Sequence, residues 1–457
     1  MPVTLNPELV RRYDRSGPRY TSYPPATAFH EGFAEAEYRA VAAESNRRHE
    51  PEPLSLYFHI PFCSTVCYYC ACNKIITANR SRAVPYLAAL EQELSLQAAL
   101  FDSERVVEQL HWGGGTPTFL SGEQMRRLMD ATRHHFRLRD DDGGEYSIEI
   151  DPRTVDADDM ALLRELGFNR VSFGVQDFDP LVQKAVNRIQ SEEQTLAVMA
   201  AARREGFHST SIDLIYGLPF QSAKSFTATL DKVIAANPDR LAVFNYAHLP
   251  QRFKTQRQID AETLPSPEEK LRILALTIDR LQDTGYVYIG MDHFARPEDT
   301  LARALSDGSL QRNFQGFSSH AECELVAMGI TAIGQVGNCY SQNVRDLDTY
   351  YESLQAGKLP VCRGVLLDDD DRLRRRVIGS LICHGFVDKQ AIAQDFDDYF
   401  DMELTELAPM QADGLLESDG DSIRVLAPGR LLIRNICMVF DRYLRRESRP
   451  ERFSKAI

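Results

Sequence analysis

Four cysteines lie close together near the start of the chain, and their types and spacing could support chemistry. Cys63, Cys67, Cys70 and Cys72 fall within ten residues, although the whole chain of 457 residues contains only nine cysteines. The spacing Cys-x3-Cys-x2-Cys places three thiolates within reach of one compact metal centre. A cubane iron–sulfur cluster normally takes four protein thiolates. A cluster bound by three therefore leaves one iron open to another ligand.

Two other uses of these cysteines fit the sequence less well. A structural zinc site usually draws its ligands from two separated pairs, and the sequence shows no second pair. A redox pair needs only Cys67 and Cys70 and leaves Cys63 without a role. The surplus Cys72 is read as a nearby free thiol, a fourth ligand or a group that acts on substrate. The other cysteines are scattered, and we expect small buried apolar residues at Cys323, Cys339, Cys362, Cys383 and Cys437.

The elements that must position the cysteines alternate between short apolar strands and longer helical stretches. Leu87, Leu90 and Leu94, for example, repeat at helical spacing between the first two strands. Such alternation indicates right-handed crossovers and a parallel sheet. We predict a partial parallel (β/α)6 barrel with strands at residues 54–62, 109–112, 146–150, 170–175, 211–215 and 240–244.

Polar and glycine residues follow several of these strands. The second strand ends in the run GGGTP, the third in Glu149 and Asp151, and the fourth in Gln176. Asp213 lies in the fifth strand, and Ala247 follows the sixth. Active sites of parallel α/β barrels gather at the carboxyl ends of the strands. We therefore expect these residues to meet at one rim.

The cysteine spacing resembles the signature of the radical S-adenosylmethionine (SAM) superfamily. That resemblance implies a [4Fe–4S] cluster with three Cys ligands, Cys63, Cys67 and Cys70, whose fourth iron binds SAM. It also implies cleavage of SAM to methionine and a 5′-deoxyadenosyl radical that abstracts hydrogen. The superfamily's fold is a partial parallel barrel, in agreement with the strand pattern. The cofactor carries the difficult chemistry, while the protein supplies position and shielding.

Further motifs resemble the oxygen-independent coproporphyrinogen III oxidases, also called dehydrogenases, within that superfamily. The resemblance covers the chain from about residue 10 to its end. Ala71 stands where the family usually has Gly, and Pro25 where Thr is common, but neither change removes a ligand. The motifs are YFHIPFC (57–63), LHWGGGTP (110–117), SIEIDP (147–152), SFGVQDF (172–178), IDLIYGLP (212–219), FNYAH (244–248), GMDHFA (290–295), NFQG (313–316), GPRYTSYP (17–24) and GRLLIRNICM (429–438).

By this resemblance the protein is an oxidoreductase of porphyrin and haem biosynthesis. It would convert two propionates of coproporphyrinogen III to vinyl groups by oxidative decarboxylation, giving protoporphyrinogen IX. The family holds two SAM molecules side by side. Contacts to the cluster-bound molecule correspond to Tyr57, Tyr69, Gly114 and Glu149. Contacts to the second correspond to Gly115, Thr116, Gln176, Arg188, Asp213, Ala247 and Ile333. No catalytic residue is assigned.

The substrate bears four carboxylates, whereas the chain has a formal net charge of −14. Cations must therefore be presented locally, and Arg19, Arg188 and the loop at residues 313–315, with Phe314 and Gln315, are the candidates. We expect an unidentified electron donor and acceptor, and a monomer. The acidic balance argues against binding of nucleic acid. No run of apolar residues is long enough for a membrane span and no signal peptide begins the chain, so a cytoplasmic protein is expected.

The chain is long enough for one large domain and a smaller one. We predict an N-terminal extension over the barrel mouth (1–50) that is not helical at residues 16–25, a barrel domain (51–360) and a helical C-terminal domain (361–457). The last domain should be winged-helix-like, with an exposed acidic turn at 368–371, a hairpin at 414–426 and a helix from about Gly429. From Arg430 to the end the chain carries eight Arg and Lys against three Asp and Glu, which we interpret as a solvated helical face.

Two alternatives belong to other functional classes. A haem chaperone of the same superfamily would resemble this chain, but such chaperones typically lack the Cys-x-Cys ending, here Cys70-Ala-Cys72, and the N-terminal motif at residues 18–24. A nucleic-acid-binding regulator would use the C-terminal hairpin and basic surplus, but it leaves the polar barrel rim unexplained.

Overall fold

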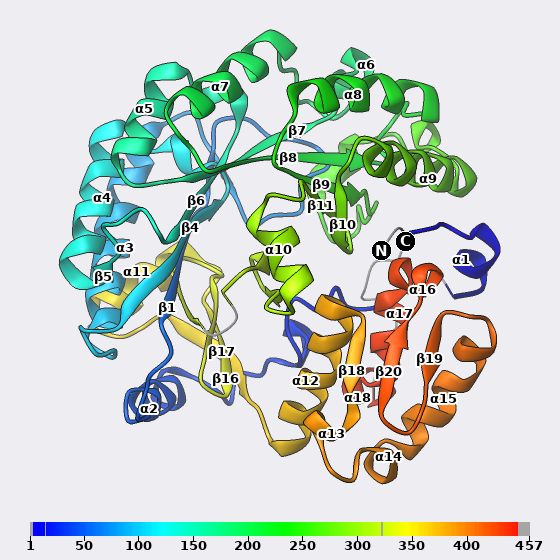
Figure 1. Ribbon diagram of the computed structural model, residues 1–457. Helices are drawn as coiled ribbons and strands as arrows, with labels where there is room; N and C mark the ends of the chain where they lie inside the picture. The colour runs from blue at the N-terminus through cyan, green and yellow to red at the C-terminus, as the bar shows by residue number, and fades with distance from the viewer. Residues whose placement is uncertain (1–2, 14, 321–322, 447–457) are drawn as a thin grey trace.

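The computed structural model describes residues 3–13, 15–320 and 323–446 and contains the predicted α/β barrel (Figure 1). Each predicted strand is present, and adjacent strands in the order β9-β8-β7-β6-β4-β1 pair in parallel. The predicted fold is therefore confirmed. The strands are β1 (Leu54–Ile60), β4 (Val106–Gly114), β6 (Glu145–Ile150), β7 (Arg170–Gln176), β8 (Ser209–Tyr216) and β9 (Arg240–Asn245).

Helices cover the outer face of this sheet and line the outside of the arc in Figure 1. Leu54, Leu56, Phe58 and Ile60 of β1 are fully buried in the main core, because alternate side chains of a strand share one face. The intervening side chains point to the barrel interior and are polar or aromatic. The covering helices are α3 (Ala83–Ala98), α4 (Gly122–His135), α5 (Ala157–Glu165), α7 (Glu192–Arg204), α8 (Ala223–Ala236) and α9 (Pro267–Asp283).

Both ends of the parallel sheet carry strands that were not predicted. β14 (Glu324–Met328) pairs in parallel with β1 and begins an antiparallel series that ends at β17. At the other end, β11 and β10 add antiparallel strands to β9. Within the described residues the sheet stays open, so the barrel is partial. The added strands are β10 (Val287–Gly290), β11 (His293–Ala295), β15 (Ile333–Val336), β16 (Cys339–Asn343) and β17 (Val361–Leu366).

The N-terminal segment packs against the C-terminal part of the chain. Residues 16–25 contain no helix, as predicted, and lie between α1 (Pro7–Tyr13) and α2 (Glu35–Ser45). Tyr20 and Tyr23 are buried in a second core built largely from C-terminal helices. The proposed boundaries at residues 50 and 360 stay predictions.

The C-terminal part contains the predicted hairpin and an additional strand. β19 (Leu416–Ser418) and β20 (Ser422–Val425) pair across Asp419 and Gly420, and β18 (Phe386–Asp388) joins the other edge of β20. The helix expected near Gly429 is present as two short helices. The surrounding helices are α12 (Asp369–His384), α13 (Lys389–Ile392), α14 (Phe396–Tyr399), α15 (Asp401–Ala412), α16 (Ala427–Leu431), α17 (Ile433–Val439) and α18 (Arg442–Arg446).

Two predictions for this region are wrong in part. The acidic run is not an exposed turn, because Asp368 caps α12 and Asp371 is buried beside Arg442 at 2.9 Å. The basic surplus is not a solvated face, because the buried Arg434 donates to the Pro18 carbonyl at 3.0 Å. Arg434 thus joins α17 to the N-terminal segment, whereas the acidic run joins α12 to Arg442. Residues 447–457 lie outside the described residues.

The scattered cysteines follow the prediction in most cases: Cys339, Cys383 and Cys437 are buried, whereas Cys323 and Cys362 are half-buried. No described helix has both the length and the apolar character to cross a membrane.

Candidate functional site

The cysteine loop leaves the barrel at the carboxyl end of its first strand. After β1 the chain enters β2 (Phe62–Cys63), which pairs in parallel with β3 (Ile75–Ile76). The loop between these short strands is anchored to the far side of the barrel, since the Tyr68 N–H donates to the Val186 carbonyl at 3.0 Å. The loop therefore starts and returns at the barrel rim.

Hydrogen-bond donors from three other segments face the cysteine sulfurs. Thr116 Oγ1 donates to Cys63 Sγ at 3.6 Å. Arg188 Nη1 and Arg153 Nη2 donate to Cys67 Sγ at 3.5 and 3.7 Å. Donors and positive charge favour the thiolate, which is the form that binds metal.

The thiols differ in acidity. Burial raises the pKa of Cys63 to about 11. A hydrogen bond from Cys72, with help from Lys74, lowers the pKa of Cys70 to about 6 despite burial. The same bond raises the pKa of Cys72 well above its ordinary value. This hydrogen bond therefore favours the thiolate at Cys70 over the thiolate at Cys72.

Most of the predicted site residues line one cavity of about 580 Å³, which we call the cysteine cavity. They come from the cysteine loop and from the carboxyl ends of four different strands or the segments that follow them. The chain thus gathers its chemistry at one rim, as a parallel barrel does. The predicted residues in this cavity are Cys63, Cys67, Tyr69, Cys70, Gly114, Gly115, Thr116, Glu149, Gln176, Arg188 and Asp213.

The glycine run after β4 lies directly against the start of the cysteine loop. Gly115 N–H donates to the Ile60 carbonyl at 2.8 Å, and a Cβ on Gly115 would come within 2.6 Å of the Pro61 carbonyl. Gly114 has a φ of +112°, a conformation that favours glycine. Glycines are therefore required here by close packing against the protein's own backbone and by the positive φ of Gly114.

Glu149 presents a carboxylate to the cavity. Its Oε2 accepts from the Gly114 N–H at 3.0 Å, and its Oε1 lies 3.5 Å from His111 Nε2. Burial alone would raise the pKa of Glu149, but the His111 and Gly114 contacts hold it below its ordinary value. The side chain remains 46% exposed. Glu149 can thus accept a hydrogen bond from a cationic ligand group.

Tyr57 lies beneath this carboxylate rather than in the cavity wall. Its ring stacks on His111 with centroids 5.8 Å apart, and its hydroxyl lies 3.0 Å from His59 Nδ1. The ring therefore supports the residue that faces Glu149.

Arg188 is held by an ion-pair network. Its Nη1 lies 3.2 Å from Asp151 Oδ2, its Nη2 donates to the Gly174 carbonyl, and Arg153 approaches the same Asp151 oxygen at 2.6 Å. All three charged side chains are largely buried. Despite burial, Arg153 and Arg188 lower the pKa of Asp151. The network fixes two guanidinium groups beside Cys67.

Gln176 and Asp213 complete the opposite wall. Gln176 adopts a φ of +69°, which is unusual for a residue other than glycine and is common at binding sites. Asp213 accepts from Ser172 Oγ at 3.2 Å. Burial, followed by the nearby Glu149 charge, raises the pKa of Asp213 to about 7.

Besides Tyr57, two residues predicted to contact SAM lie outside this cavity wall. Ala247 is linked to the loop indirectly, because Gln256 Nε2 donates to the carbonyls of both Ala247 and Tyr69, at 3.2 and 3.0 Å. Ile333, on β15, packs against an apolar cluster that contains Phe29 and Tyr340.

The residues predicted to contact substrate do not share one cavity. Arg19 forms an ion pair with Asp292 at 2.9 Å and lies over the Phe244 ring. Gln315 lines a second cavity inside the barrel. Phe314 packs edge-on against Tyr340, with centroids 5.9 Å apart.

Comparison with known proteins agrees with this arrangement. Residues 57–233 match the model of the radical SAM superfamily, and residues 367–432 match that of the HemN C-terminal domain. The chain is 54% identical to the oxygen-independent coproporphyrinogen III oxidase of Pseudomonas aeruginosa, with 100% of this chain and 99% of that protein aligned. This chain belongs to that family.

Further similarities support the family assignment. The oxygen-independent coproporphyrinogen III oxidase of Escherichia coli is 50% identical, with 98% of each chain aligned. The solved structure of E. coli coproporphyrinogen III oxidase (HemN), described as a radical SAM enzyme, superposes with a TM-score of 0.92 at 48% identity, covering 97% of this chain and 100% of that chain. Radical SAM membership implies a [4Fe–4S] cluster and SAM as cofactors.

The sequence reasoning gave no role to four residues of this site, although it expected Asp151 at the rim. The Tyr57 hydroxyl links His59 to the ring that stacks on His111, and His111 lies against Glu149, while Asp151 and Arg153 hold Arg188. All four fall inside or directly beside the motifs of this oxidase family. Their roles could not be read from the sequence because each depends on a contact between segments distant in the chain.

Proposed function

We propose that this protein catalyses the oxidative decarboxylation of coproporphyrinogen III to protoporphyrinogen IX. Each of two propionates gives up one β-hydrogen atom, CO2 and one electron and becomes a vinyl group. The observation that carries this proposal is the convergence of the cysteine loop with Glu149, Arg188 and Asp213 on one cavity in a chain of this family. The relatives are named oxidases, which favours this function over a haem chaperone.

Cys63, Cys67 and Cys70 are the proposed ligands of the [4Fe–4S] cluster. Their fit is supported by the donors from Thr116 and Arg188 that face their sulfurs. Within the described part of the chain, no three His, Cys, Asp or Glu side chains gather closely enough to hold a single metal ion. A cubane does not need such a group, because each cysteine binds a different iron.

The bound cluster and SAM together supply a 5′-deoxyadenosyl radical, and the protein's residues position the reactants. Glu149 is suited to the amine of one SAM, because its carboxylate is charged and faces the cavity. Arg188 offers a fixed fork of donors for a carboxylate. Tyr57, Tyr69 and Gly114 are proposed to complete the contacts to the cluster-bound SAM.

A second SAM beside the first is proposed to contact Gly115, Thr116, Gln176, Arg188 and Asp213. These residues line the same cavity, which supports the proposal. Ala247 and Ile333 do not line the cysteine cavity, and we still propose that they contact the second SAM. Arg19, Phe314 and Gln315 stay proposed substrate contacts.

The reaction needs one electron to enter and one to leave for each propionate. The donor and acceptor are separate, unidentified partners. We propose that the protein acts as a monomer in the cytoplasm, where a reducing environment keeps thiols available for the cluster.

Anaerobic reconstitution with iron and sulfide tests this function. Dithionite, SAM and coproporphyrinogen III would be added, and 5′-deoxyadenosine, CO2 and protoporphyrinogen IX measured. The expected result is two deoxyadenosines and two CO2 for each protoporphyrinogen. Formation of deoxyadenosine without decarboxylation would support the radical SAM assignment and contradict coproporphyrinogen III as the substrate. Haem binding without either product would favour a chaperone.

A further inference from the structure

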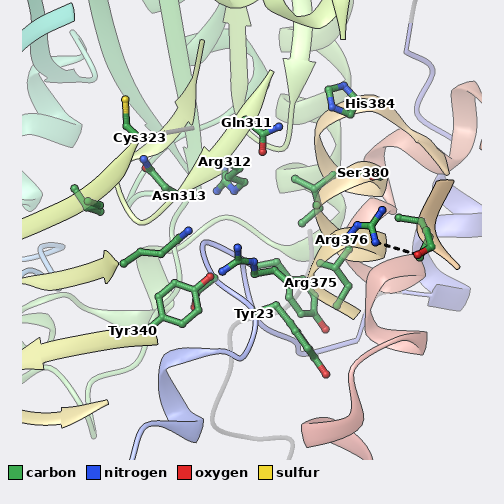
Figure 2. Close-up of a pocket in the computed structure, with 18 of the residues that line it drawn as sticks. Tyr23, Gln311, Arg312, Asn313, Cys323, Tyr340, Arg375, Arg376, Ser380 and His384 are labelled. Atoms are coloured by element: carbon green, nitrogen blue, oxygen red, sulfur yellow. Dashed lines mark hydrogen bonds between the residues drawn. The ribbon is translucent and has the colours of Figure 1, made fainter. Parts of the chain in front are cut away.

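A separate cavity of about 420 Å³ lies between the barrel and the C-terminal part of the chain. One wall comes from β12 (Gln311–Asn313), and another from α12. The buried segment that contains Tyr20 and Tyr23 closes a further side. Figure 2 shows side chains from these walls pointing into a common space. We call it the arginine cavity, after Arg312 and Arg375.

Arg312 and Arg375 present buried donors that have no partner. Nε and Nη1 of Arg312 and Nη1 of Arg375 are inaccessible to solvent and make no hydrogen bond to described residues. The Arg312 guanidinium lies 4.6 Å from the centre of the Phe317 ring, which fixes its plane. Arg376 in the same cavity differs, because its Nη1 donates to the Ile392 carbonyl at 3.0 Å.

The nearby carboxylates are occupied elsewhere. Asp292 faces Arg312, but it is already paired with Arg19 at 2.9 Å. Asp388 lines the cavity, yet its carboxylate accepts from the Ala391 N–H and caps α13. The described lining therefore holds a positive surplus inside a protein whose net charge is −14.

Buried guanidinium donors without partners are costly, because burial removes their hydration. A ligand that brings carboxylates would offset this cost, since the arginine fork matches a carboxylate in two parallel hydrogen bonds. A neutral ligand would leave the positive charge of the guanidinium groups uncompensated. The chemistry of the lining therefore selects an anion.

The arginine cavity and the cysteine cavity each adjoin a third cavity in the barrel interior. Asn313 lines both the arginine cavity and the barrel-interior cavity of about 220 Å³. That middle cavity in turn shares Glu149, Ser172 and Asp213 with the cysteine cavity. Three spaces thus follow one another from the cysteines to the arginines.

Aromatic side chains line the middle space. His293 meets Phe244 and Phe317 edge-on, with ring centroids 5.8 and 5.4 Å apart. All three rings line the barrel-interior cavity. Burial, with Arg312 close by, lowers the pKa of His293 to about 3, so this wall stays neutral. The rest of this cavity is lined by polar and charged side chains, including Glu145, Arg170 and Arg240. The three rings therefore form an apolar patch against which a ring system with charged substituents could pack.

We propose that Arg312 and Arg375 bind propionate carboxylates of the tetrapyrrole substrate that are not being decarboxylated, while another propionate faces the cysteine cavity. This inference rests on the proposed function. It assigns the apolar macrocycle to the aromatic wall and anchors it at the end opposite the cysteines. The two arginines are recognition residues that set orientation and affinity.

The test uses anaerobically reconstituted full-length protein and coproporphyrin III, a non-reacting probe with the same four propionates. Fluorescence titration would give its Kd with wild type, Arg312→Gln and Arg375→Gln. Loss of a charged hydrogen bond predicts a rise in Kd of about tenfold or more for each variant. Arg376→Gln is the matched control, since this arginine lines the same cavity but bonds the backbone, and its Kd should stay at the wild-type value.

The tetramethyl ester of coproporphyrin III separates charge recognition from packing. The ester should bind wild type more weakly, and the arginine substitutions should weaken its binding little further, because it has no carboxylate to lose. Circular dichroism and iron content would check folding of each variant, with Arg375→Lys as a milder second variant that keeps charge but loses the fork.

The outcomes distinguish the inference from the proposed function. Unchanged Kd values for coproporphyrin III in Arg312→Gln and Arg375→Gln, with normal turnover by wild type, would overturn the inference alone. If the arginine substitutions weakened the binding of coproporphyrin III and of its tetramethyl ester equally, the inference would also be overturned, because the loss of affinity would then come from altered packing. Wild type that neither binds the probe nor forms protoporphyrinogen would reject the proposed function.

Discussion

The cysteine cavity and the arginine cavity treat buried charge in opposite ways. In the first, Arg153 and Arg188 share Asp151, so each guanidinium has a carboxylate partner before a ligand arrives, although Arg188 Nε makes no hydrogen bond to a described residue. In the second, Arg312 and Arg375 hold buried donors that make no hydrogen bond to any described residue. SAM carries both an amine and a carboxylate, so a balanced site suits it. A substrate with four carboxylates instead requires a positive surplus.

The largest expected effect follows from removing a cluster ligand. Cys67→Ala should lose the iron–sulfur absorbance and all decarboxylation, because two thiolates cannot hold the cubane in place. Iron and sulfide content after anaerobic reconstitution would measure this. Cys362→Ala is the control, since that half-buried thiol lies outside the cysteine cavity. Cys72→Ala should keep full iron content; loss of iron would make Cys72 a ligand and contradict the three-cysteine assignment.

The next largest effect is expected from removing Asp151, the carboxylate that pairs with Arg153 and Arg188 in the cysteine cavity. Asp151→Ala leaves two largely buried guanidinium groups without their carboxylate, and we expect a loss of about 3–5 kcal/mol in the free energy of unfolding. Chemical denaturation of the protein without cofactors would measure it. Asp151→Asn should lose less, because the amide oxygen still accepts from Arg153. A stability equal to wild type for the alanine variant would show that this pair does not organise the site.

Removing a charge from the arginine cavity should raise the stability of the protein, whereas removing Asp151 from the cysteine cavity should lower it. Arg312→Met removes an uncompensated buried cation and keeps an apolar stem against Phe317, so we expect stability to rise by about 1 kcal/mol or more. Arg376→Met should change stability little, because that side chain is exposed. Thermal unfolding without ligand is sufficient for the comparison. A fall in the stability of Arg312→Met would indicate a stabilising partner and weaken the contrast between the cavities.

A smaller effect is the pH dependence that comes from Asp213. Its folded pKa of about 7 exceeds the ordinary value near 3.9, so the folded state holds the proton more tightly than the unfolded state. Stability from this group is therefore full below about pH 4 and is lost as pH rises through 7. Asp213→Asn should gain little stability over wild type at pH 4 and most at pH 8, in denaturant unfolding at both values. An equal gain at the two values would contradict this assignment.

The sequence predicted the parallel half of the fold well, because buried parallel strands are apolar runs separated by amphipathic helices. It missed β10, β11 and β14–β17. These strands have only three to six residues, which is too short for a clear pattern of apolar residues. Cys339 and Gln342 on β16 show a mixture of apolar and polar residues, which does not produce a continuous apolar run.

The parts of the site formed by local sequence motifs could be predicted. The parts formed by contacts between residues distant in the sequence could not. The glycine run and Glu149 could be placed at a strand end from the sequence. The pairing of Arg188 with Asp151, or the absence of such a partner for Arg312 and Arg375 among the described residues, depends on contacts across the fold. The acidic run 368–371 was misread for the same reason, because its partner Arg442 lies about seventy residues later.

Transfer of deuterium from the substrate to 5′-deoxyadenosine tests the account most directly. Coproporphyrinogen III labelled at the β-carbons of its reacting propionates would be incubated anaerobically with the reconstituted protein, dithionite and SAM, and deoxyadenosine analysed by mass spectrometry. We predict one deuterium in each deoxyadenosine formed during turnover, with one CO2 released per transfer. Unlabelled deoxyadenosine accompanied by protoporphyrinogen would contradict hydrogen abstraction at that carbon.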